Sequence, residues 1–132
     1  MPKVSVRYIQ GKQLMGAARQ HAVIFDQPSD KEGTDLGFTP TELFLFALGS
    51  CMSYNMLAYG QRNGMKIEQL QVELVDEVSK SPERISKVTA QINISGELSE
   101  EEVNRLWRSA KGCKIHNTLR AVPEIEVTIQ KM

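Results

Sequence analysis

The feature that most constrains the fold is a long apolar segment in the middle of the chain. It reads FLFALGSCMSYNMLAYG over residues 44–60. Thr39 and Glu42 precede it in the pattern of a capping box, and Gly64 follows at a position typical of a helix C-terminus. The spacing predicts a helix over 40–63, about 36 Å long from the rise per residue of a helix. Because apolar side chains lie all around it, we expect a second copy of the chain to cover part of it.

Runs of β-forming residues on both sides of this helix predict an antiparallel sheet. The predicted strands are 3–9, 21–26, 66–78, 84–98 and 124–130. A turn and an extra short strand fit between the first two, and residues 27–37 have the composition of a surface loop.

A second helix is predicted near the C-terminus. Ser99 and Glu102 form another capping box, the helix stops at Gly112, and residues 113–121 predict a further helical turn or two. The order of elements predicts an α+β fold with antiparallel sheets packed on helices, in one domain over residues 1–132.

Charge balance, the N-terminal pattern and the number of cysteines limit which partners and which cellular compartment we expect. Sixteen basic residues balance sixteen acidic ones, so we expect no nucleic acid partner. The N-terminus lacks a signal-peptide pattern, and no uninterrupted apolar run approaches a membrane span, so we expect a cytoplasmic protein with no membrane partner. Two cysteines are too few for a secreted disulfide scaffold, and a disulfide in a reducing cytosol would be transient or catalytic.

The two cysteines are the main candidates for chemistry. Cys51 is a small hydrophobe of the core on one interpretation, and on the other a nucleophile to which Gly49 and Ser53 leave access. Cys113 follows Gly112 at the start of a short helix, where unpaired N–H groups favour a thiolate, so local physics predicts that it is the more acidic sulfur. A dithiol that cycles to a disulfide requires the fold to bring the two together.

Other polar candidates have structural explanations of their own. His116 lies near Cys113, but a structural zinc site needs four ligands, so we expect neither a metal nor another cofactor. Glu42 is a candidate base or orienter of a cation, although the capping box already accounts for it within one chain. A dimer would bring it to the site of a second copy.

Two segments together resemble a known superfamily. GFTPTELFLFALGSCMS at residues 37–53, followed by AKGCKIHNTLR at residues 110–120, is similar to the osmotically inducible protein C and organic hydroperoxide resistance (OsmC/Ohr) superfamily. The resemblance implies an intertwined homodimer in which Cys51 attacks an organic hydroperoxide and Cys113 resolves the sulfenic acid to a disulfide. An external thiol or dithiol then reduces the disulfide, and Arg7 or Arg19 is the candidate cation beside Cys51.

Two other functions compete with a thiol peroxidase. A dimeric stress protein that binds an apolar small molecule at the subunit interface, without turnover, fits the same apolar helix. A thioesterase-like protein, in which a sheet wraps a long helix, ranks last because no catalytic carboxylate is evident beside a substrate.

Overall fold

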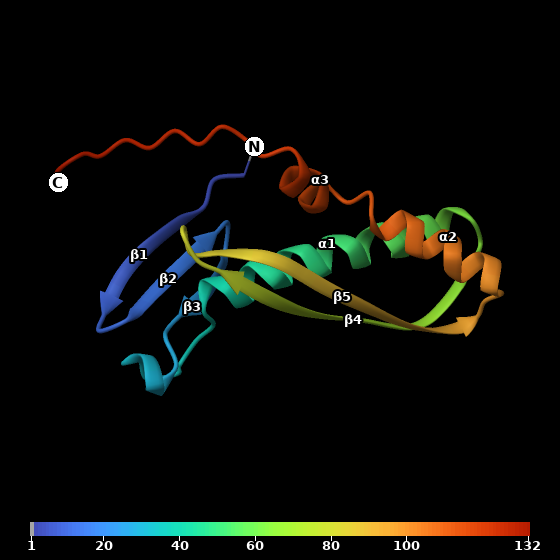
Figure 1. The fold of residues 1–132 in the computed structure, drawn as a ribbon, viewed down its shortest axis with the longest axis horizontal. Coiled ribbons are helices and arrows are strands. Elements are labelled where there is room, and N and C mark those ends of the chain that lie inside the picture. The colour runs from blue at the N-terminus through green and yellow to red at the C-terminus, as the bar shows by residue number, and fades with distance from the viewer. Residues whose placement is uncertain (1) are drawn as a thin grey trace. The chain divides into compact units, whose positions relative to one another are not determined.

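The central helix is the longest helix of the fold. The computed structural model describes residues 2–132. The chain divides into two compact units, an N-terminal one that ends at Phe46 and a C-terminal one that begins at Ala47. Helix α1, Pro40–Arg62, matches the predicted span and contributes to both units (Figure 1). The predicted capping box is confirmed, since the N–H of Thr39 donates to the Glu42 carboxylate at 2.8 Å and the N–H of Glu42 donates to the Thr39 hydroxyl at 3.2 Å.

The N-terminal unit contains a small antiparallel sheet. Its strands, in the spatial order β1-β2-β3, are β1 Ser5–Gln10, β2 Gln13–Ala18 and β3 His21–Phe25. Strand β2 is the extra short strand expected between the first two predicted strands. Gly11 takes a φ of 54° in the turn between β1 and β2, where a residue without a Cβ is favoured.

A buried carboxylate organises the loop after this sheet. Asp26 is 1 % exposed and accepts hydrogen bonds from the N–H groups of Gln27 and Leu36, at 2.7 and 3.1 Å, and from the Thr34 hydroxyl. The hydrogen bond from Thr34 is the main reason why the pKa of Asp26 falls from its ordinary value of 3.8 to about 2. The predicted loop is therefore ordered, and a short 3₁₀ turn, Ser29–Lys31, interrupts it.

The C-terminal unit consists of a long β-ribbon and helices. Strands β4 Lys66–Ser79 and β5 Arg84–Glu97 pair antiparallel, as predicted, and the ribbon runs along α1 (Figure 1). Its inward residues pack on a core of α1 and α2 side chains. These inward residues are Ile67, Leu70, Val72, Leu74, Val88, Ala90, Ile92 and Ile94.

Two helices complete this unit. Helix α2, Glu100–Ala110, begins with the predicted Ser99 capping box, and α3, Lys114–Arg120, begins at Cys113. Leu106 and Ala110 of α2 are buried against α1. These contacts place the start of α3 next to the middle of α1.

The prediction of a strand over 124–130 is wrong for the single chain, because the structure has no strand after α3. A strand needs backbone hydrogen bonds to a neighbour, and this segment makes none within the described residues. Its apolar side chains are exposed, and Ile125 and Val127 keep 79 % and 86 % of their surface.

Helix α1 is only partly covered. Leu48, Met52 and Met56 are buried, whereas Phe46 and Tyr54 are 52 % and 73 % exposed. The helix is long and apolar enough to cross a membrane. The core helix of a globular protein can have the same length and composition, so this property does not indicate a membrane span. The predicted burial on all sides is therefore incomplete in a single chain.

Candidate active site

The fold brings the two cysteines together inside the C-terminal unit. Cys51 lies in the middle of α1, and Cys113 is the N-cap residue of α3. Both are free thiols, and Cys51 lies close enough to Cys113 to raise the pKa of the Cys113 thiol. Cys113 is fully buried in the core, whereas Cys51 is half-buried and packs against that core. The pair therefore meets the requirement of proximity that a dithiol site imposes.

The environment of Cys113 disfavours its thiolate. Burial raises the pKa of the Cys113 thiol, and the neighbouring Cys51 side chain raises it as well. The N–H of His116 donates to the Cys113 sulfur at 3.3 Å and lowers this pKa, but by less than burial raises it. The expectation that a helix N-terminus makes Cys113 acidic is therefore wrong, because desolvation dominates.

Helix α2 is fixed on α1 by two polar contacts near the cysteines. One turn after Cys51, the Asn55 side chain donates a hydrogen bond to the Ser109 carbonyl at 3.2 Å. Farther along α1, the Tyr59 hydroxyl accepts a hydrogen bond from Arg105 at 2.9 Å. Because Ser109 lies in the last turn of α2, Asn55 helps to position the loop that carries Cys113. Asn55 was not among the residues expected at the site, although an amide within an apolar helix is a usable signal.

The histidine beside Cys113 contributes through its main chain. The hydrogen bond from His116 to the sulfur comes from the backbone N–H, while the buried ring Nδ1 has no hydrogen-bond partner within residues 2–132. Among those residues, no group of three His, Cys, Asp or Glu side chains lies close enough to hold a metal ion. The arrangement is therefore a thiol pair with a neighbouring imidazole.

The structure places Glu42 in the first turn of α1, two and a half turns before Cys51 along the helix. Its carboxylate accepts the N–H of Thr39, and the residue belongs to the N-terminal unit. The candidate cations belong to the same unit: Arg7 is exposed on β1, and Arg19 is exposed in the turn between β2 and β3. A catalytic role for Glu42 therefore stays a prediction.

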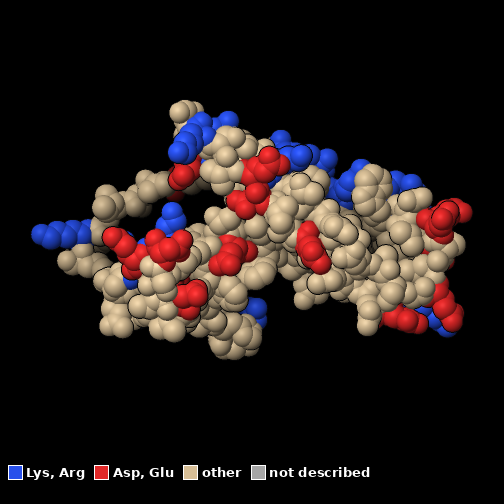
Figure 2. All heavy atoms as spheres, turned by 60° about the horizontal axis from the view of Figure 1, so that its bottom comes forward, with Lys and Arg blue, Asp and Glu red and all other residues tan. Residues whose placement is uncertain are grey.

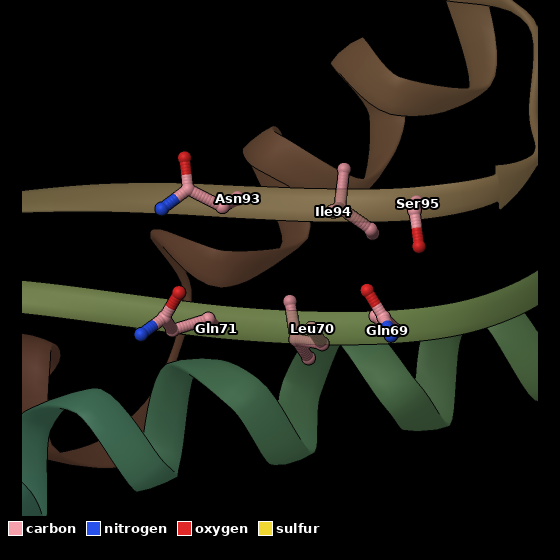
Figure 3. Close-up of a pocket in the computed structure, with 6 residues that line it drawn as sticks. All are labelled: Gln69, Leu70, Gln71, Asn93, Ile94 and Ser95. Carbon is pink, nitrogen blue, oxygen red and sulfur yellow. The ribbon is translucent and has the colours of Figure 1, made fainter.

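Two hollows of the C-terminal unit differ in chemistry: one lies on the β-ribbon, and the other is lined by residues of α1, β5 and α2. The hollow on the ribbon, of about 370 Å³, is lined by the polar residues Gln69, Gln71, Asn93 and Ser95 and by Leu70 and Ile94 (Figure 3). The other, of about 320 Å³, is mostly apolar, and its lining includes Met56, Ile92 and Trp107. Neither is lined by a cysteine, so the sulfur chemistry does not lie in these hollows.

A comparison with protein families identifies the class. The family described as OsmC-like protein matches residues 33–128, a span that contains Glu42, Cys51 and Cys113. The chain belongs to this OsmC-like family, and hence to the OsmC/Ohr superfamily. No curated protein sequence matches it.

Solved structures share the fold at low sequence identity. An OsmC-like protein from Mycoplasma pneumoniae superposes with a TM-score of 0.82 at 20 % identity, over 92 % of this chain and 89 % of that one. For the organic hydroperoxide resistance protein OhrB of Bacillus subtilis the TM-score is 0.67 at 17 % identity, over 92 % of each chain. An organic hydroperoxide resistance protein OsmC from Legionella pneumophila gives 0.69 at 16 %, over 92 % and 90 %. These likenesses confirm the α+β fold with antiparallel sheets and a long central helix.

Proposed function

We propose that this protein is a thiol-dependent peroxidase that reduces organic hydroperoxides through Cys51 and Cys113. The observation that carries the proposal is the contact between the two free thiols, with Cys113 buried and Cys51 half-buried. Membership of the OsmC-like family and the fold shared with hydroperoxide resistance proteins support the same chemistry.

The proposed reaction uses sulfur alone. The Cys51 thiolate attacks the terminal oxygen of the hydroperoxide, the O–O bond breaks, and the alkoxide leaves as an alcohol after taking up a proton. Cys51 is then a sulfenic acid. The Cys113 sulfur attacks it, a disulfide forms, and water leaves. A thiol or dithiol reductant returns both cysteines to the reduced state.

A homodimer is part of the proposal. Exposed Phe46 and Tyr54 on α1 and exposed Ile125 and Val127 on the C-terminal segment need a partner surface. In such a dimer Glu42 would orient an arginine, Arg7 or Arg19, toward the Cys51 site of the other subunit.

The test is the intact mass after one equivalent of a tert-alkyl hydroperoxide. The wild-type protein should lose about 2 Da as the disulfide forms, and Cys113→Ser should gain about 16 or 32 Da as sulfenic or sulfinic acid. The matched variant Cys51→Ser should keep its mass and consume no peroxide. Unchanged masses in all three proteins would exclude the peroxidase.

A second candidate function is supported by the apolar hollow. Its lining of Met56, Ile92 and Trp107 favours a small apolar ligand bound without turnover. Trp107 is the only tryptophan of the chain, so its fluorescence reports on this hollow directly. Saturable quenching by a fatty acid, together with unchanged masses under peroxide, would establish the binder in place of the enzyme.

A further inference from the structure

The apolar hollow of the C-terminal unit lies where α1, β5 and α2 meet. Its lining residues, which come from these three elements, are Met56, Ile92, Ile94, Val103, Asn104, Leu106 and Trp107. Its volume of about 320 Å³ suits a small molecule. Neither Cys51 nor Cys113 lines it, so a ligand held here would not occupy the proposed redox centre.

The hollow has an enclosed base and an open mouth. Met56 and Leu106 are buried, with 0 % and 1 % of their surface exposed. Trp107 keeps 50 % of its surface, and Asn104 is exposed as well, so these two residues lie where the hollow meets solvent. An apolar base with one amide at its mouth fits a molecule that is apolar over most of its length and polar at one end.

Two features of the lining suit an occupant of this kind. The unbranched and polarisable side chain of Met56 can adapt its shape to a hydrocarbon chain. Lys111 Nζ lies 3.8 Å from the centre of the Trp107 ring and holds that ring by a cation–π contact. Because Lys111 follows Trp107 by four positions and Val103 precedes it by four, the ammonium group lies beyond the indole, away from the hollow.

Charges of both signs flank the mouth. Residues three and four positions apart on a helix are neighbours, so Glu100 and Glu101 lie to one side of Asn104 and Arg108 lies to the other. Figure 2 shows the same division, with acidic side chains at the outer end of α2 and Lys and Arg side chains along α2 and α3. A charged ligand would therefore meet a like charge at the mouth, and its charge would lose water in the apolar base.

The amide of Asn104 indicates which polar group the ligand carries. An amide both donates and accepts hydrogen bonds, and a hydroxyl group does the same without a charge. We propose that the hollow is a binding site for a neutral aliphatic alcohol, whose chain occupies the base and whose hydroxyl group hydrogen-bonds Asn104. The proposal rests on the second candidate function, for which it names the class of ligand, and it does not require turnover at the cysteines.

The proposed dimer leaves this site free. The exposed side chains that need a partner surface, Phe46 and Tyr54 of α1 and Ile125 and Val127 of the C-terminal segment, do not line the hollow. A second copy is therefore not needed to cover it, and occupation by a second copy becomes an outcome of the test.

The experiment measures binding by the fluorescence of Trp107, with dithiothreitol present and no peroxide. The probes are straight-chain primary alcohols from hexanol to nonanol. Their dissociation constants should fall about fourfold for each added methylene, until the chain outgrows the hollow. Octanoate and octylamine at neutral pH should bind about tenfold more weakly than octanol, because each would carry a charge into the site.

A variant that fills the hollow locates the binding. Val103→Phe adds a ring within the lining and should weaken octanol binding by about tenfold or more. The matched control, Val75→Phe, makes the same change at an exposed position of β4 outside the hollow and should bind as wild type does. Circular dichroism checks that both variants are folded.

A second variant tests the polar contact and does not alter the base. Asn104→Leu should weaken octanol binding about fivefold through loss of the hydrogen bond. It should bind octyl chloride, which lacks the hydroxyl group, at least as tightly as wild type. Equal losses for both probes would mean that the variant damages the hollow and that Asn104 does not recognise a hydroxyl group.

Four results would overturn the site. They are quenching that does not saturate, octanoate that binds as tightly as octanol, equal octanol affinities of wild type and Val103→Phe, and octanol that binds only as self-association weakens in sedimentation. The last would mean that a second copy occupies the hollow. None of these measurements involves peroxide, so failure of the alcohol site is distinguishable from failure of the peroxidase.

Discussion

Asn55 on α1 donates a hydrogen bond of 3.2 Å to the carbonyl oxygen of Ser109, 54 positions later in the chain. It lies one helical turn beyond Cys51, and its acceptor lies four residues before Cys113. This contact ties the segment that carries one sulfur to the helix that carries the other. Asn55 is therefore a positioning residue for the thiol pair.

Replacing Asn55 with alanine should slow formation of the disulfide. Without the amide, the end of α2 is held less firmly, and small displacements of reacting groups cost large factors in rate, so we expect a loss of about tenfold or more. Oxidation of Cys51 to sulfenic acid, measured with a dimedone trap, should keep its rate. Asn93→Ala, at an exposed amide of β5 that contacts neither α1 nor α2 through a hydrogen bond, is the control and should change neither step.

The second half of the proposed cycle should depend on pH. The pKa of Cys113 is raised, so its thiolate is scarce at neutral pH, and its fraction grows about tenfold per pH unit below that pKa. Stopped-flow measurement of the step from sulfenic acid to disulfide should therefore show a rate that still rises at pH 9. A plateau at neutral pH would mean that Cys113 does not attack as a free thiolate.

Much of the fold follows from local signals in the sequence. The capping boxes at Thr39 and Ser99 fixed the starts of both longer helices, because side-chain hydrogen bonds to the first turn are encoded within four residues. The contact between Cys51 and Cys113 was not predictable from spacing, since it depends on how α2 docks on α1. The acidity of Cys113 was mispredicted for the same reason: burial is a property of the tertiary structure, whereas the helix terminus is local.

Asp26 should make the loop of the N-terminal unit sensitive to acid. Its folded pKa, about 2, lies below the ordinary value of 3.8, so its contribution to stability is complete above pH 3.8 and is lost as the pH falls toward 2. Hydrogen exchange at the amides of Thr34 and Leu36 should accelerate over this window. Asp26→Asn should exchange fast already at neutral pH, while Asp30→Asn, at an exposed position of the same loop, should behave as wild type.

The C-terminal segment provides a test of the dimer at single-residue resolution. Ile125, Val127 and Ile129 alternate with polar residues, which is the pattern of a strand with one buried face, although the segment has no strand partner within its own chain. We expect it to add as a strand to a second copy, with Val127 on the covered face and Thr128 on the other.

Val127→Lys should therefore weaken dimerisation by about tenfold or more, because a charge would be desolvated in the interface. Thr128→Lys, one position away, should leave the dissociation constant from analytical ultracentrifugation nearly unchanged. Val127 is 86 % exposed in the single chain, so the substitution should not unfold the monomer, and circular dichroism checks this. Equal effects of the two lysines would contradict strand addition by this segment, and a folded wild-type monomer at low micromolar concentration would contradict the dimer.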